Sequence, residues 1–132
     1  MDKIRVYALR LNKEGKPCKG YFMDIDNDAN AWKEYVGGWP QEVTLKPGIV
    51  VICDEDGKLK NYLPNRAFAG NGHIVDYFVG DIFVCRRDEY HLSSINEVDI
   101  ALVEDILLPI EKLMGNEIMC RPAMSLPEYK EK

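Results

Sequence analysis

The sequence lacks the close cysteine spacings that indicate a metal or redox site. Its four cysteines, Cys18, Cys53, Cys85 and Cys120, are far apart, so no two form a zinc knuckle or a local redox pair. Cys53 and Cys85 each end an apolar run, and a reduced thiol in such a run packs as a small hydrophobic side chain. We therefore expect buried, structural cysteines.

Long apolar runs are also missing. No stretch approaches the roughly 20 apolar residues that a membrane helix needs. The N-terminal MDKIRVYALRL alternates apolar and polar side chains, and it lacks the apolar core and cleavage site of a signal peptide. These absences predict a cytoplasmic protein with no membrane contact.

Positive charge is scarce and scattered. The chain has 17 lysines and arginines against 22 aspartates and glutamates, which gives a formal net charge of -5. The only adjacent basic pair, Arg86 and Arg87, is followed at once by Asp88 and Glu89. Because a nucleic-acid-binding protein presents a basic face, direct binding to DNA or RNA is disfavoured.

The length of the chain limits its domain organisation. A chain of 132 residues with 46% hydrophobic side chains can bury one core, but it is short for two ordinary domains. We expect a single domain over residues 1–115. An irregular tail over residues 116–132, which contains Pro122 and Pro127, should follow it.

The N-terminal part predicts a hairpin followed by a short helix. Residues 4–11 alternate apolar and polar positions, and residues 20–25 can pair back on them. In DNDANAWKEYVGG, Asp28 or Asn27 can cap the start of a helix, and Gly37 stands where a left-handed C-cap would fall. The helix should therefore end at the VGG segment.

Three strands are expected next, over residues 39–45, 47–53 and 58–63. Pro47-Gly48 and the acidic segment DEDG supply tight turns between them. Because IVVIC is apolar throughout, we expect a central strand there, buried on both faces. The LPNRAFAGNG segment that follows has the composition of a loop.

The C-terminal part predicts a further strand at residues 82–86 and either a helix or a strand at residues 74–79. From about residue 95 the apolar spacing is helical, with Ser94 and Glu97 in the positions of a capping box. Pro109 should kink or divide this helix. The helix has more apolar surface than one sheet face covers, which predicts a homodimer formed through it.

These elements together indicate an α+β fold. We expect an antiparallel sheet of about five or six strands, with a short helix after the N-terminal hairpin. A longer C-terminal helix should pack on the sheet.

The acidic residues do not form a convincing metal site. Asp24, Asp26 and Asp28 have the alternate spacing of a calcium loop, but Ala29 stands where the loop requires glycine, and Tyr35 where it requires glutamate. Helix capping explains the same residues, and the DEDG segment is typical of a solvated hairpin tip. We expect no bound metal and no cofactor.

No local catalytic motif is present. His73 and His91 lie in no zinc or triad pattern, and the sequence has no nucleophile elbow, HExxH segment or Walker-type phosphate loop. A site could still assemble from distant residues such as His73, Asp76 and Asp81. A non-enzymatic function is therefore favoured over an enzymatic one.

Four residues are candidates for a binding site: Tyr62, Asn65 and Arg66 in YLPNRAF, and Trp39. Arg66 could hold a carboxylate or phosphate of a ligand or partner through its planar guanidinium. Alternatively, Asn65 fixes the turn and Arg66 pairs within the fold with an acidic residue: Asp54, Glu55, Asp76 or Asp81. Trp39 fits either the core or an aromatic platform at a sheet edge.

Several segments together resemble a known family. They are the VGG of residues 36–38 with Glu42 after it, VVICDEDGKL, the LPNRA of residues 63–67 and the VGDIFVC of residues 79–85. In their order and spacing, over residues 3–90, they resemble the domain of unknown function family 3846. The resemblance implies an accessory protein of bacteria, phages, plasmids or integrated elements, and it brings no catalytic residue with it.

Three functions are compatible with the sequence. The leading hypothesis is a non-enzymatic protein of a phage or other mobile element that binds a host protein, for instance to inhibit a defence system. Its acidity would complement a basic partner and speed association. The alternative is a protein that binds or sequesters a nucleotide-like small molecule, with Arg66 on phosphate and Trp39 or Tyr62 stacked on the base. A small enzyme is the third hypothesis.

Overall fold

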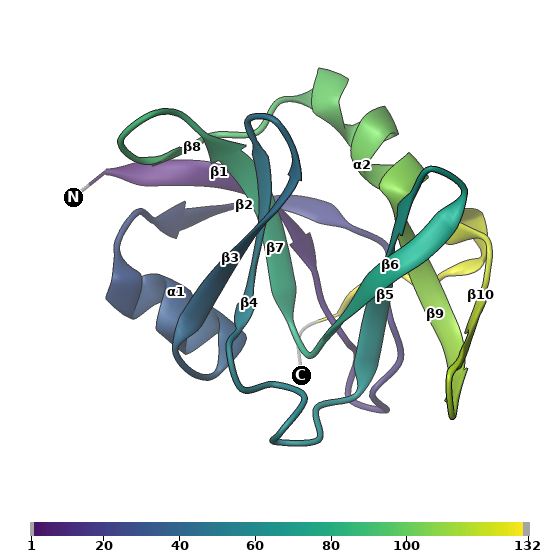
Figure 1. Ribbon diagram of the computed structural model, residues 1–132. Coiled ribbons are helices and arrows are strands. Elements are labelled where there is room, and N and C mark those ends of the chain that lie inside the picture. The colour runs from purple at the N-terminus through teal and green to yellow at the C-terminus, as the bar shows by residue number, and fades with distance from the viewer. Residues whose placement is uncertain (1, 131–132) are drawn as a thin grey trace.

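The computed structural model describes residues 2–130, which form two antiparallel sheets and two short helices (Figure 1). The first sheet has the order β2-β1-β7-β4-β3, with β8 paired to β7, and the second has the order β10-β9-β5-β6. The strands of the first sheet are β1 (Lys3–Leu9), β2 (Tyr21–Asp26), β3 (Pro40–Lys46), β4 (Ile49–Asp54), β7 (Ile82–Arg87) and β8 (Leu92–Ser93). Those of the second are β5 (Pro64–Gly70), β6 (His73–Val79), β9 (Leu107–Met114) and β10 (Glu117–Cys120). The α+β class is thus confirmed, whereas the single sheet is a wrong prediction.

The predicted helix after the N-terminal hairpin is present as α1 (Ala29–Val36). Asp28 caps its start, because its side chain accepts a hydrogen bond from the backbone N–H of Ala31 at 2.8 Å. Gly37 ends it in the left-handed conformation, with φ of 94° and its N–H donated to the carbonyl of Lys33. Local chemistry alone therefore fixes both ends of this helix.

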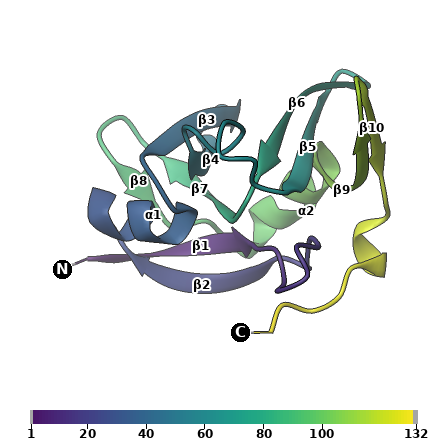
Figure 2. The same cartoon turned by 90° about the horizontal axis from the view of Figure 1, so that it is seen from below.

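The first sheet is buried on both faces, which explains the unbroken apolar run of β4. All six residues of Ile49–Asp54 are buried, and alternate side chains face opposite sides of the sheet. Val50 and Ile52 pack in one cluster with Val36 of α1. Val51 and Cys53 pack in a second cluster, together with side chains of α2 (Ile100–Ile106) and of the second sheet. Figure 2 shows α1 and the second sheet at different sides of the first.

Three of the cysteines are buried as expected, and Cys120 is partly buried; all four are free thiols. Burial raises the pKa of Cys53 to about 11 and that of Cys85 to about 12. These two thiols behave as apolar core side chains.

The strand predicted at residues 58–63 and the loop predicted after it are both wrong. Asp54 organises the segment into successive turns: its buried carboxylate accepts bonds from the N–H of Asp56 at 2.9 Å and from Lys60 Nζ at 2.8 Å. Asn61 then adopts a left-handed φ of 60°. The chain becomes extended only at Pro64, the first residue of β5, where its missing N–H is tolerated.

The long C-terminal helix is also a wrong prediction. Asn96 and Asp99 form the capping box in place of Ser94 and Glu97, and a 3-10 turn, Glu97–Asp99, leads into α2, which ends at Ile106. Pro109 disfavours helix at its own position and before it, and it lies instead in β9, opposite Arg66 of β5.

Two further segments, residues 74–79 and 117–120, are strands of the second sheet. Residues 74–79, for which helix and strand were both possible, belong to β6. Residues 117–120, predicted to be part of an irregular tail, form β10 and pair with β9. Residues 121–130 return to the first sheet, where Tyr129 stacks on Tyr21 at 5.6 Å between ring centroids.

Candidate functional site

Three of the segments that resemble the family, VGG, LPNRA and VGDIFVC, contribute residues to one pocket of about 460 Å³. We call it the tyrosine pocket. Its walls are the loop after β1, the end of α1, the residues before β5 and the turn between β6 and β7. Its lining residues are Leu11–Gly15, Tyr35–Gly37, Tyr62, Leu63, Gly80 and Asp81.

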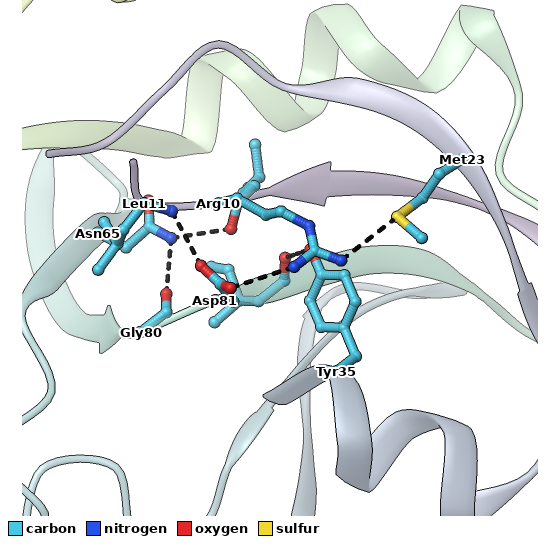
Figure 3. Close-up of polar contacts among 9 residues, drawn as sticks. Arg10, Leu11, Met23, Tyr35, Asn65, Gly80 and Asp81 are labelled. Atoms are coloured by element: carbon cyan, nitrogen blue, oxygen red, sulfur yellow. Dashed lines mark hydrogen bonds and ion pairs between the residues drawn. The ribbon is translucent and has the colours of Figure 1, made fainter. Parts of the chain in front are cut away.

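Asn65 ties together three of these walls from inside the protein. Its side chain is fully buried, and Nδ2 donates to the carbonyls of Leu9 at 2.9 Å and Gly80 at 2.7 Å (Figure 3). One amide group thereby joins the start of β5 to the end of β1 and to the β6–β7 turn. Asn65 supports the pocket without lining it.

Arg66 is buried beside Asn65, with 1% of its surface exposed. Nη1 donates to Asn65 Oδ1 and Nη2 to the carbonyl of Cys18, both at 2.8 Å. Burial lowers the pKa of this guanidinium. The group is directed into the fold, so it is not available to a ligand in the pocket.

The acidic partners predicted for Arg66 all bind elsewhere or face solvent. Asp54 pairs with Lys60, Asp76 pairs with Lys58, and Asp81 pairs with Arg10. Among residues 2–130, Arg66 has no carboxylate within ion-pair distance. The structural alternative for Arg66 is realised through a carbonyl and an amide instead of an ion pair.

Asp81 forms one wall of the pocket and is held in place by two neighbours (Figure 3). Oδ1 accepts the backbone N–H of Leu11 at 2.9 Å, and Oδ2 accepts Arg10 Nη1 at 3.2 Å. The Arg10 guanidinium also lies over the ring of Tyr35, 4.1 Å from its centroid. Tyr35 donates its hydroxyl to the carbonyl of Ile82 at 2.8 Å, and burial raises its pKa well above the usual range.

Tyr62 lies in a cradle made by glycines. A Cβ atom at Gly37 would be 2.7 Å from the Tyr62 hydroxyl, and one at Gly80 would be 2.7 Å from the ring. Both glycines have left-handed φ values, 94° and 73°, so two independent constraints favour glycine at each position. The Tyr62 hydroxyl lies 3.3 Å from the carbonyl of Gly37 and donates to it.

Trp39 does not belong to the core, and it does not line the pocket. Its side chain is 64% exposed, and the Lys33 ammonium lies 4.2 Å from the ring centroid. It follows the Gly37-Gly38 turn immediately before β3. The placement matches the exposed aromatic platform that was the alternative to a core position.

A family model for the domain of unknown function DUF3846 matches residues 8–107. The chain belongs to this family. The match confirms the resemblance seen in the sequence, and it covers the tyrosine pocket. β10 and nearly all of β9 lie beyond it. No curated protein and no solved structure matches the chain.

The lining of this DUF3846 pocket offers more hydrogen-bond acceptors than positive charges. The acidic residues Asp81 and Glu14 belong to the lining, whereas the carbonyl of Gly37 already accepts the Tyr62 hydroxyl and Lys60 Nζ. Lys13 is the only cationic residue of the lining. This chemistry suits a ligand that donates hydrogen bonds, and it is poor for a phosphate.

The dispersed residues considered for catalysis are not brought together. His73 begins β6, whereas Asp81 follows the turn after its other end, and Asp76 is engaged with Lys58 at 3.0 Å. Residues 2–130 contain no group of three or more His, Cys, Asp or Glu side chains placed to hold a metal. No helix in this range is long and apolar enough to cross a membrane.

Of the residues that the sequence offered as binding candidates, Tyr62 lines the pocket; the sequence did not indicate that Tyr35, Asp81 and the loop after β1 lie beside it. The available signal was the pair of glycines at residues 37 and 80, each within a segment that resembles the family. Their shared partner, Tyr62, becomes evident only in three dimensions.

Proposed function

We propose that the chain is a non-enzymatic binding protein whose ligand occupies the tyrosine pocket. The observation that supports this most directly is the pocket itself. Its volume of about 460 Å³ falls within the roughly 300–1,000 Å³ of small-molecule sites. Part of its wall, Val36, Gly37, Leu63, Gly80 and Asp81, comes from three of the segments that carry the family resemblance, which suggests a shared purpose for these three segments.

The lining indicates the chemical class of the ligand. A small, planar molecule with amino or amide N–H groups would place its ring against Tyr62 and its donors against Asp81 and Glu14. A nucleobase or nucleoside has this chemistry. The nucleotide-like ligand, which was the alternative hypothesis from the sequence, is therefore proposed here without its phosphate, because Arg66 is buried.

Preorganised walls support specific binding. Asp81 and Tyr35 are fixed by hydrogen bonds, and Tyr62 is held by its glycine cradle. Fixed side chains lose little conformational freedom when a ligand binds, which favours affinity.

Thermal unfolding with a panel of nucleobases, nucleosides and the matching nucleotides tests the proposal. At least one unphosphorylated compound should raise the melting temperature, since a ligand at 100 times its dissociation constant stabilises by about 2.7 kcal/mol. Glu14→Gln should weaken the shift, while Glu89→Gln, an exposed residue outside the pocket, should not. No shift with any base or nucleoside, or an equal shift in Glu14→Gln, would overturn it.

A second candidate is the host-protein binder of a phage or other mobile element, for instance an inhibitor of a defence system, acting in the cytoplasm. Two exposed apolar side chains support it: Leu63, on the pocket lining with 53% exposed, and Trp39, two residues beyond Gly37. Exposed aromatic and apolar anchors are the usual energetic centre of a protein interface. The net charge of -5 would favour a basic partner.

Affinity capture from host lysate separates this candidate from the first. We expect Leu63→Asp and Trp39→Ala to lose a specifically captured protein that wild type retains, and Tyr90→Ala, at an 84% exposed aromatic elsewhere, to keep it. Capture that is equal in all four proteins would exclude the pocket side as the interface.

A further inference from the structure

The hairpin formed by β9 and β10 has an unusual surface. From Glu111 to Glu117 every residue is exposed, and large apolar side chains lie among them. Leu113, Met114 and Met119 are 37%, 52% and 44% exposed. β10 is also the edge of its sheet, at the margin of the molecule in Figure 1.

An open edge strand normally carries charge, proline or a strong distortion, which prevents pairing with another chain. The ladder shifts register between Met119 and Cys120, but the extra residue, Glu111, is on β9, and the central residues of β10, Ile118 and Met119, are apolar. Its charges stand only at the two ends, with Glu117 at one and Arg121 just beyond the other. The edge is therefore open to pairing, and its ends carry opposite charges.

The register of the hairpin shows which backbone groups of β10 are free. Gly115 and Asn116 form a two-residue loop closed by Met114 and Glu117, a pair that exchanges hydrogen bonds across the hairpin. The alternation of an antiparallel ladder then turns the N–H and C=O of Ile118 away from β9.

The far end of β10 continues this pattern past the bulge. Arg121 donates its N–H to the carbonyl of Pro109 at 3.0 Å, so its backbone faces β9. The preceding residue, Cys120, therefore faces outward, like Ile118. Two residues with free backbone groups thus flank Met119.

We infer that β10 pairs antiparallel with β10 of a second copy, about a twofold axis at Met119. In this register Ile118 lies opposite Cys120 of the second copy, so the free backbone groups meet each other. Glu117 lies opposite Arg121 of the second copy, and Met119 lies opposite itself. The two four-stranded sheets become continuous.

Two antiparallel copies of β10 thus match each other in charge and in free backbone groups. This match favours a second copy of the chain over a different partner. Arg121 binds Ser125 through Nε and Nη2, which leaves Nη1 for the carboxylate of Glu117. A register shifted by one residue would set free backbone groups against groups already bonded to β9. The interface differs from the one predicted through the C-terminal helix, because that helix ends at Ile106.

Sedimentation over a concentration series tests the inference. Wild type should shift from monomer to dimer mass as concentration rises. Met119→Lys should stay monomeric with an unchanged circular dichroism spectrum, because two ammonium groups would face each other on the axis. Val98→Lys, at an 83% exposed apolar residue of the helical segment, should dimerise like wild type.

A cysteine scan checks the register. In a Cys120→Ser background, Met119→Cys should form a disulfide-linked dimer under mild oxidation, since facing residues of a non-hydrogen-bonded pair lie about 4.5 Å apart at Cα. Met114→Cys, exposed on the neighbouring strand, should cross-link far more slowly. A wild type that stays monomeric, dimers that survive Met119→Lys, or equal cross-linking by both cysteines would overturn the inference.

Discussion

Two regions of the molecule depart in opposite directions from the usual burial of apolar side chains and exposure of polar ones. At the start of β5, Asn65 and Arg66 are almost completely buried. In the β9–β10 hairpin, Met114 and Met119 are about half exposed, 52% and 44%. The buried polar pair makes its hydrogen bonds inside the chain, with Arg66 Nε alone lacking a partner, whereas the exposed apolar pair lies about half in solvent. The contrast separates residues that maintain the fold from residues available for interaction.

The largest effect should come from Asn65→Ala. This substitution leaves the carbonyls of Leu9 and Gly80 and one Arg66 donor without their partner in the interior. Each such group costs about 1–3 kcal/mol, so we expect a loss of about 3 kcal/mol or more in the free energy of unfolding. Urea denaturation measures it. A loss below about 1 kcal/mol, the size of one ordinary hydrogen bond, would show that these contacts do not support the fold.

Gly80→Ala should have the next largest effect. Alanine at φ of 73° is strained, and its Cβ would lie 2.7 Å from the Tyr62 ring. We expect a loss of about 2 kcal/mol in the free energy of unfolding. In a Tyr62→Ala background the loss should fall to about 1 kcal/mol, because only the backbone strain remains. An equal loss in both backgrounds would show that the Tyr62 ring does not pack against Gly80.

Alkaline pH should destabilise the first sheet through its thiols. Burial raises the pKa of Cys53 to about 11 and of Cys85 to about 12, whereas an unfolded thiol ionises near about 8.5. Above that pH the unfolded chain binds fewer protons than the folded chain, so stability falls as pH rises.

Cys85→Ala should reduce this pH dependence, by about 1 kcal/mol between about pH 7 and pH 9.5. The comparison uses the difference in unfolding free energy between the two pH values, so any cavity cost of the substitution cancels. Cys120→Ala in the exposed hairpin serves as the control and should change the dependence less. The same dependence in Cys85→Ala and wild type would argue against the burial of that thiol.

The smallest effect on stability should come from Met114→Ser in the hairpin. The residue is 52% exposed, and exposed substitutions usually change the free energy of unfolding by less than about 0.5 kcal/mol. Thermal denaturation is sufficient to check it. A loss of about 2 kcal/mol would mean that the hairpin packs against the rest of the chain more than its exposure indicates.

Features that are fixed by residues close together in the sequence could be predicted. Asp28 and Gly37 act within one turn of the helix that they bound, so the ends of α1 were predictable. The apolar run of β4 predicted a strand buried on both faces, which it is.

Elements that depend on distant contacts were missed. The β5 strand pairs with β9 through Arg66 and Pro109, which are far apart in the sequence. Its pairing with β6 follows from the two-residue turn of Asn71 and Gly72, a local hairpin signal that was read as part of a loop. Its polar side chains gave a loop-like composition, and the carbonyls of Leu9, Cys18 and Gly80, all outside β5, make their burial favourable. Because Cys18, which supplies a carbonyl to Arg66, is distant in the sequence, the chemistry of Arg66 alone suggested a ligand contact.

Residue-resolved amide hydrogen exchange tests the central contrast most directly, with wild type and Met119→Lys compared at a concentration where wild type is dimeric. The account predicts that Arg66 and Ala67 are among the best protected amides in both proteins, and that Ile118 and Cys120 are protected in wild type but exchange rapidly in Met119→Lys. Equal exchange of the Ile118 and Cys120 amides in the two proteins, or early exchange at Arg66, would contradict it.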